Sequence, residues 1–224
     1  MSRMPSLSLM SAAIAAAVAA TAVAGGVGPR QGALRVRATA AVGPCVQAAA
    51  RAYEKAGGSA VVETGGLGPD VAADVFVGAA VEITRALEGG AAAADSDTEI
   101  ARVPWVLVVS TGNPYQLQRL ADAARTDVEV WVAGGAAAHA ARRSAQAEAQ
   151  GHVREASDGA VPSGAAAVLA PVCLAGAGER LPTDVPDLVV EAAVSARAKS
   201  PEGARLFMAF LASPAGRSAF APAP

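Results

Sequence analysis

The chain has 224 residues, 60 of them alanine, and its 18 basic side chains are nearly balanced by 20 acidic ones. The hydrophobic content of 53% excludes a disordered chain, and the lack of a basic surplus argues against binding to nucleic acid. Two widely spaced cysteines exclude a disulfide-dense scaffold, and two histidines are too few for a typical histidine-based metal site.

The first 24 residues have the pattern of a cleaved export signal. Arg3 supplies a short positive region, an apolar run follows from 10 to 23, and Ala22-Val23-Ala24 forms a small-x-small cleavage pattern. The alternative is a membrane anchor, although the run is short and rich in alanine. We expect export, with a mature chain that begins near Gly25 and lies in the periplasm or outside the cell.

Short apolar runs then alternate with alanine-rich segments, which predicts an α/β fold. The first elements expected are a strand at 34–39, a helix at 44–56, strands at 59–63 and 73–77, and a helix at 80–87. The apolar segment 100–110 is interrupted by Pro104, and such a strand is long enough to cross from one lobe to another.

The second half of the chain repeats this alternation. Its expected elements are a helix at 116–124, a strand at 128–133, a helix at 136–150, strands at 152–154, 165–172 and 188–194, and helices at 201–211 and 214–220. A Ser-Pro pair begins each of the last two helices, supplying a cap and a first-turn residue.

No constellation of catalytic residues is present, so we expect no enzyme, catalytic residue, metal site or cofactor. Glycines instead recur where strands end and helices begin, at Gly43, 65–68, Gly78 and 134–135. Free N–H groups at such turns bind anions, and ligands of open α/β sheets lie at the carboxyl ends of strands. The alternative is that each glycine only makes a tight turn, but four together favour a binder of small ligands.

Three segments resemble the periplasmic molybdate-binding proteins of ABC importers, which are type II solute-binding proteins. They are 73–81 (ADVFVGAAV), 100–122 with its GNP turn and LAD, and 200–220, which begins SPEGARLF. The likeness covers about residues 33–221 and implies a two-lobed type II fold with a mixed sheet flanked by helices in each lobe. Lobe 1 is then 33–102 and 171–221, and lobe 2 is 103–170.

The resemblance also implies a ligand site, and this sequence departs from the family there. The positions of a Ser-Leu pair are Ala41 and Val42, the serine of another turn becomes Thr64, and a further serine becomes Gly78. A hinge tyrosine falls on Pro171. The ligand-binding residues carried over are Thr39, Ala41, Val42, Thr64, Gly65, Gly78, Ala79 and Pro171.

Two further features leave alternatives open. Arg35 and Arg37 alternate along one strand, so they lie on one face; Arg37 either adds positive charge to an anion cleft or belongs to an exposed sheet face, the interpretation favoured. The resemblance places Cys45 and Cys173 on two sides of the same cleft. They either form a disulfide or remain two unpaired buried side chains, the second being slightly favoured.

The function implied is capture of a small oxyanion, such as molybdate or tungstate, by a monomeric extracytoplasmic protein. Its partners are then the oxyanion and an ABC permease in the membrane, with no nucleic acid. The alternative is a degenerate fold of this class, which binds another small solute or acts as an interaction module outside transport.

Overall fold

The computed structural model describes residues 32–126, 128–156, 161–162 and 164–221. The predicted export signal lies outside the described residues and stays a prediction. Among those that are described, no helix is both long and apolar enough to cross a membrane.

The first lobe is built on a five-stranded sheet in the order β2-β1-β3-β10-β4. Its strands are β1 (Leu34–Ala38), β2 (Ala60–Thr64), β3 (Val75–Ala79), β4 (Thr98–Val103) and β10 (Leu188–Val194). Strands β2 and β3 pair in parallel with β1, so all three end at one edge of the sheet, whereas β10 is antiparallel to both of its neighbours.

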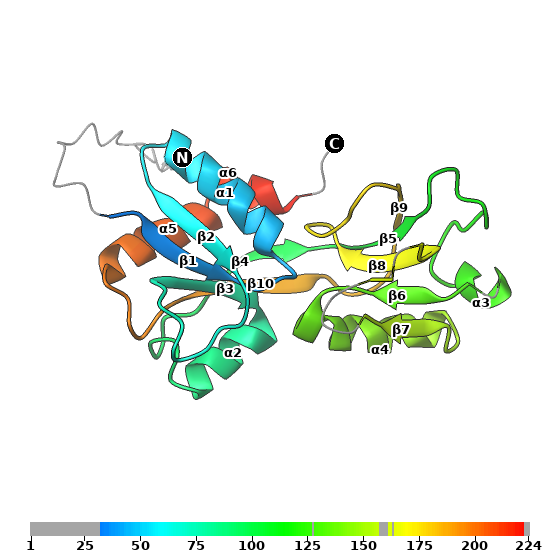
Figure 1. Ribbon diagram of the computed structural model, residues 1–224, viewed down its shortest axis with the longest axis horizontal. Helices are drawn as coiled ribbons and strands as arrows, with labels where there is room; N and C mark the ends of the chain where they lie inside the picture. The colour runs from blue at the N-terminus through cyan, green and yellow to red at the C-terminus, as the bar shows by residue number, and fades with distance from the viewer. Residues whose placement is uncertain (1–31, 127, 157–160, 163, 222–224) are drawn as a thin grey trace, which may run out of the picture. The chain divides into compact units, whose positions relative to one another are not determined.

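Helices cover both faces of this sheet (Figure 1). They are α1 (Gly43–Lys55), α2 (Ala80–Glu88), α5 (Pro201–Ala212) and the short α6 (Pro214–Arg217), which continues as the 3-10 helix η3 (Ser218–Phe220). Proline lies in the first turn of α1, α5 and α6, where its missing N–H costs no hydrogen bond. Helix α1 is followed by Gly57 at φ +93°, a backbone conformation that favours glycine.

The second lobe is built on another five-stranded sheet, in the order β7-β6-β8-β5-β9. Its strands are β5 (Trp105–Val109), β6 (Val130–Val132), β7 (Val153–Glu155), β8 (Ala167–Pro171) and β9 (Glu179–Pro182). The helices of this lobe are α3 (Asp122–Thr126), η1 (Gly135–Ala137) and α4 (Ala138–Glu148). Both sheets share one pairing pattern. Three strands run parallel, the fourth is antiparallel to them, and the edge strand is antiparallel to the fourth.

The chain passes between the lobes twice. The predicted interruption at Pro104 separates β4 of the first sheet from β5 of the second. The chain returns to the first lobe only after β9, because β9 pairs with β5 in the second sheet. The predicted return at residue 171 is therefore too early, since β8 and β9 both belong to the second sheet.

One predicted element needs correction, and one strand was missed. The helix predicted at 116–124 is reduced to Asp122–Thr126, because Gln116 has φ +51° and the Asp122 carboxylate accepts the N–H groups of Gln118 and Arg119. Strand β9 was not predicted at all, since its four residues have no apolar alternation. Strand β10 has the predicted bounds, 188–194.

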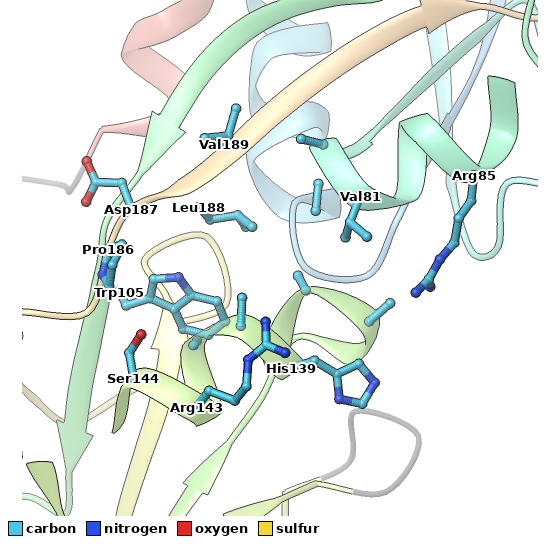
Figure 2. Close-up of a pocket in the computed structure, with 16 residues that line it drawn as sticks. Val81, Arg85, Trp105, His139, Arg143, Ser144, Pro186, Asp187, Leu188 and Val189 are labelled. Carbon is cyan, nitrogen blue, oxygen red and sulfur yellow. The ribbon is translucent and has the colours of Figure 1, made fainter. Parts of the chain in front are cut away.

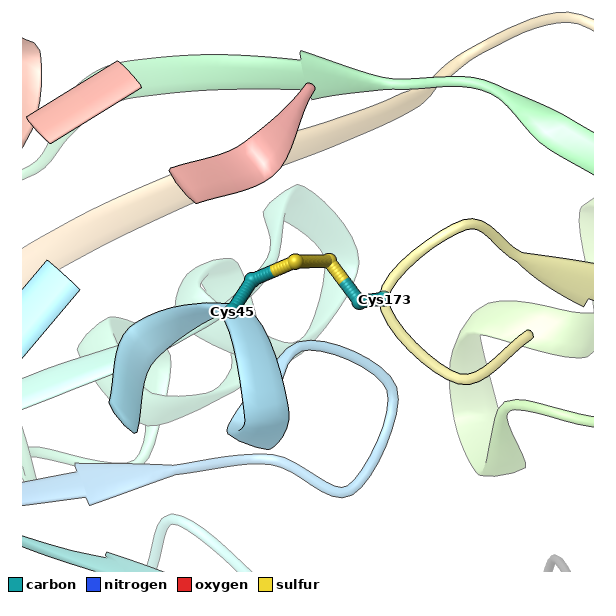
Figure 3. Close-up of a disulfide and its surroundings, with 2 residues drawn as sticks. All are labelled: Cys45 and Cys173. Atoms are coloured by element: carbon teal, nitrogen blue, oxygen red, sulfur yellow. A yellow bond between two sulfur atoms is a disulfide. The ribbon is translucent and has the colours of Figure 1, made fainter. Parts of the chain in front are cut away.

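A disulfide joins the two lobes (Figure 3). Cys45, in the first turn of α1, is bonded to Cys173, two residues after β8, and their Cα atoms are 5.3 Å apart. The favoured alternative of two unpaired cysteines is therefore wrong. The bridge connects the start of a first-lobe helix to a loop of the second lobe.

Candidate functional site

The carboxyl ends of β1, β2 and β3 bring seven of the eight predicted site residues to one edge of the first sheet. These residues are Thr39, Ala41, Val42, Thr64, Gly65, Gly78 and Ala79. The parallel pairing of the three strands accounts for this grouping, since β1 pairs with both of the others. Whether they bind a ligand stays a prediction.

Thr39 is the polar side chain most enclosed at this edge. The residue is 5% exposed, and its Oγ1 has no hydrogen-bond partner among the described residues. Its backbone is fully used, because the N–H donates to the Val77 carbonyl and the carbonyl accepts from Val42 and Gly43. The hydroxyl is thus held in a fixed turn without a partner of its own.

Ala41 and Val42 are buried and contribute their side chains to the hydrophobic core. The Val42 N–H already donates to the Thr39 carbonyl at 3.2 Å, within the turn that leads into α1. This predicted backbone donor therefore has a partner inside the protein.

Gly78 and Ala79 end β3, directly before α2. The Ala79 N–H donates to the Glu82 carboxylate at 3.0 Å. A Cβ at Gly78 would lie 3.0 Å from the Thr39 methyl and 3.2 Å from the same Glu82 oxygen, so only glycine leaves Thr39 and Glu82 their present positions. A carboxylate thus occupies the N-terminus of α2, where the resemblance expects a bound oxyanion.

Thr64 and Gly65 lie at the end of β2. Thr64 is exposed and its methyl packs on Gly43, while the Gly65 N–H donates to the Ala38 carbonyl at 2.9 Å. Arg37 lies over this turn: its Nε donates to the Gly66 carbonyl, and its Nη1 is 3.3 Å from the Glu63 carboxylate. Arg35 and Arg37 share one face of β1, as predicted, and Arg37 is paired there with Glu63.

Pro171, the eighth predicted residue, belongs to the second lobe. It ends β8, pairs in register with Trp105 of β5, and packs beside Gly134. It is buried, and it lies in the lobe opposite to the other seven.

A first cavity lies at the strand ends and has a volume of about 360 Å³. Both lobes line it; the residues are Thr39, Ala40, Gly65, Gly66, Leu67, Glu82, Arg85 and Ala136. We call it the strand-end cavity. Arg85 of α2 is its one basic residue and Glu82 its one acidic residue, so the cavity presents both charges beside the Thr39 hydroxyl.

A second and larger cavity, the apolar cavity, shares Arg85 and Ala136 with the first and measures about 490 Å³. Figure 2 shows the side chains around it, with α2 on one side and α4 on the other. Its apolar surface includes Val81, Trp105 and Leu188, and its charged residues are Arg85, Arg143, His139 and Asp187. The His139 imidazole lies 3.2 Å from the Glu155 carboxylate.

Sequence reasoning missed most of the residues that line these cavities. Arg85 and Val81 are four apart on α2 and share a helix face, a spacing that was visible in the sequence. The other residues, Trp105, Ala136 and Arg143, come from the second lobe and meet Arg85 only in the folded chain. Their spacing in the sequence does not predict that they lie together. The arrangement can hold an anion by hydrogen bonds and charge.

No family model matches the chain, and no curated protein matches its sequence. Among solved structures, the periplasmic molybdate-binding protein of Azotobacter vinelandii aligns with a TM-score of 0.65 at 16% identity, over 84% of this chain and 96% of that one. The sulfate-binding protein SubI of Mycobacterium tuberculosis also has a TM-score of 0.65 at 16% identity, over 84% of each chain. Peb3 of Campylobacter jejuni follows at 0.64 and 15%, over 84% and 96%.

The chain has the type II periplasmic solute-binding protein fold. This confirms the predicted fold class, two mixed sheets flanked by helices. A periplasmic thiamin-binding protein also aligns, with a TM-score of 0.55 at 16% identity. These neighbours are solute-binding proteins, and their names include both inorganic and organic ligands: molybdate, sulfate and thiamin.

Proposed function

We propose that the protein is an extracytoplasmic solute-binding protein that captures a small oxyanion between its lobes for an ABC importer. The observation that carries the proposal is the Thr39 hydroxyl, buried without a partner in the described structure beside a cavity lined by both lobes. Leaving such a group unpaired costs about 1–3 kcal/mol, and a ligand oxygen that accepts its hydrogen removes this cost.

The charge at the strand-end cavity supports an anion as ligand. Arg85 lines the cavity, and its guanidinium has no hydrogen bond or ion pair with any described side chain. Ala136 brings the start of the second-lobe helical segment to the same cavity, and N–H groups at helix starts favour negative charge. The resemblance makes molybdate and tungstate the first anions to test.

The proposal includes export and action as a monomer that docks on a membrane permease. Mass spectrometry of the secreted protein should find a chain beginning near Gly25. Retention of residues 1–24 in a membrane fraction would contradict the export part of the proposal. It would leave the ligand-binding part standing.

A second candidate function is an interaction module that no longer transports a solute. Two observations favour it: the Cys45–Cys173 bridge ties the lobes together, and Glu82 holds the Ala79 N–H that an oxyanion would use. A ligand must displace or tolerate this carboxylate, which repels a fully ionised anion. Ligand binding discriminates between the two functions.

A thermal-shift panel of molybdate, tungstate, sulfate and phosphate is the direct test. A ligand at 100 times its Kd adds about 2.7 kcal/mol, or about 5–10 °C of Tm for a chain of this size. Thr39→Val should reduce the shift without lowering the Tm of the free protein, because it removes an unpaired hydroxyl. Thr111→Val, in an exposed turn, is the matched control. No shift with any anion at millimolar concentration would favour the second candidate.

A further inference from the structure

The apolar cavity adjoins the strand-end cavity, with which it shares Arg85 and Ala136, and is the larger of the two. Its volume of about 490 Å³ falls within the roughly 300–1,000 Å³ of sites that bind small organic molecules. Val81 of α2, Trp105 of β5 and Leu188 of β10 supply apolar walls from three separate elements. An inorganic oxyanion gains nothing from these walls, because its whole surface is polar.

The alanines of η1 and α4 shape the same space from the second lobe. Ala136, Ala137, Ala140 and Ala141 all line the cavity, and their small side chains leave room between α4 and α2. Larger residues at these positions would narrow the cavity. The space is thus a product of side-chain size along one helical segment, and a single substitution can reduce it.

Two guanidinium groups approach this space from opposite lobes. Arg85 extends from α2 and Arg143 from α4, toward the region between the two helices (Figure 2). Neither forms an ion pair or a side-chain hydrogen bond with any other described residue. Asp187 is the one acidic residue that lines the cavity, so positive charge prevails there. Cations that have no partner among the described residues, on both sides of a cavity, attract an anion between them.

We infer that the solute is an organic anion: an acidic head group joined to an apolar body of about the size of one ring. This inference rests on the proposed function and names its substrate class. Arg85 lines both cavities, so it contacts the head group beside Thr39 while the body lies against Val81, Trp105 and Leu188. Phosphonates, phosphate esters, sulfonates and carboxylates share the required head-group chemistry.

Paired ligands with one head group test the role of the body. Calorimetry compares phenylphosphonate with methylphosphonate, and benzenesulfonate with methanesulfonate, alongside phosphate, sulfate and molybdate. We expect each ring-bearing ligand to bind at least about tenfold more tightly than its methyl partner, because the ring buries apolar surface. Equal affinities within both pairs would overturn the inference and leave the proposed function intact.

Variants of α4 locate the body in the apolar cavity. Ala140→Leu, on a cavity-lining position, should abolish the preference for the ring and keep the binding of methylphosphonate. Ala147→Leu is the matched control, because Ala147 is an exposed alanine of the same helix that lines neither cavity. A preference that survives Ala140→Leu would place the body elsewhere and overturn the assignment.

Arg143→Gln tests the charge from the second lobe. It should weaken every anion that binds with a ring by several-fold, and weaken it less at high salt, where the charge is screened. If no anion of either kind binds to the unsubstituted protein, the proposed function fails together with this inference. If inorganic anions bind and the ring-bearing ones do not, only the inference fails.

Discussion

The two lobes have the same strand pairing but different interiors. The largest fully buried side chains of the first lobe include Phe76, Phe207 and Phe220, with Ile83 and Ile100 beside them. In the second lobe the corresponding residues are leucines, and α4 packs against its sheet through Ala138, Ala141 and Ala145.

Alanine buries less apolar surface than leucine or phenylalanine, so α4 gains less hydrophobic stabilisation per residue where it packs against its sheet. Of its buried alanines, Ala141 also lines the apolar cavity, together with Ala136, Ala137 and Ala140. We expect the second lobe to depend for part of its stability on its attachments to the first lobe, and the following experiments test that dependence.

The largest effect is expected from removing the disulfide. Cys45→Ala with Cys173→Ala opens a loop of 128 residues, which the chain-entropy treatment values at about 5 kcal/mol. Urea unfolding measures the loss, and hydrogen exchange should show amides of the second lobe exposed before those of the first. Reduced unsubstituted protein is the control. A loss below about 1 kcal/mol, or uniform exchange in both lobes, would contradict the dependence.

The next effect concerns a buried carboxylate of the first lobe. Asp74 is 6% exposed and accepts the backbone N–H groups of Arg35, Lys199 and Ser200. Asp74→Ala leaves these donors without their acceptor, and we expect a loss of about 3 kcal/mol in urea unfolding. Asp70→Ala is the control, since that exposed carboxylate lies 3.9 Å from Arg197 and should matter by less than about 0.5 kcal/mol. Equal effects of the two would refute the role of Asp74.

Asp122 is the second-lobe counterpart, and its effect depends on pH. A hydrogen bond from the Gln118 N–H, with further help from Arg125, lowers the pKa of the Asp122 carboxyl. Because the unfolded chain then binds the proton more readily, stability from this group is present above the ordinary Asp pKa of about 4 and is lost as the pH falls. Asp122→Asn should flatten the stability curve below about pH 4, measured by urea midpoints. If the variant loses stability below pH 4 as steeply as the unsubstituted protein, Asp122 does not have this role.

The smallest effects are expected from two carboxyls whose pKa is raised in the folded protein, in contrast to that of Asp122. Burial, followed by the charges of Asp97 and Glu99, raises the pKa of Glu191 in the first lobe. Burial and Asp184 raise the pKa of Glu148 in the second. Each ionised carboxyl opposes folding above its raised pKa, so stability increases as the pH falls toward the ordinary value of about 4.3.

Glu191→Gln and Glu148→Gln should therefore raise the Tm slightly at pH 7 and have no such effect near pH 4. Differential scanning calorimetry at the two pH values measures this, with the exposed Glu88→Gln as control. A Tm that falls at pH 7 would show that the charge is stabilising after all.

Much of the first lobe could be predicted from sequence because its elements carry their own boundary signals. Pro44 and Pro201 mark helix starts, and Gly57 ends α1. In the second lobe such signals were fewer: the predicted helix at 116–124 failed because side-chain hydrogen bonds hold that segment in a loop. The prediction succeeded where proline and glycine marked the ends of elements, and overall hydrophobicity was a poorer guide.

The candidate site likewise has a part that the sequence predicts and a part that it does not. Residues at strand ends, such as Thr39 and Ala79, could be grouped because parallel strands end at one edge. The cavity between the lobes depends on Trp105, Arg143 and Arg85, which are brought together only by the folded chain. The disulfide likewise depended on a distance between Cα atoms that the sequence does not contain.

The same bridge has a consequence for how the chain matures. Under the proposed export, Cys45 enters the oxidising compartment before Cys173, and it must remain a thiol until the distant half of the chain has followed. With only two cysteines in the sequence, every intramolecular disulfide is the native one. Maturation therefore requires a donor of oxidising equivalents and no disulfide isomerase, and its one hazard is pairing with a second molecule while Cys45 waits.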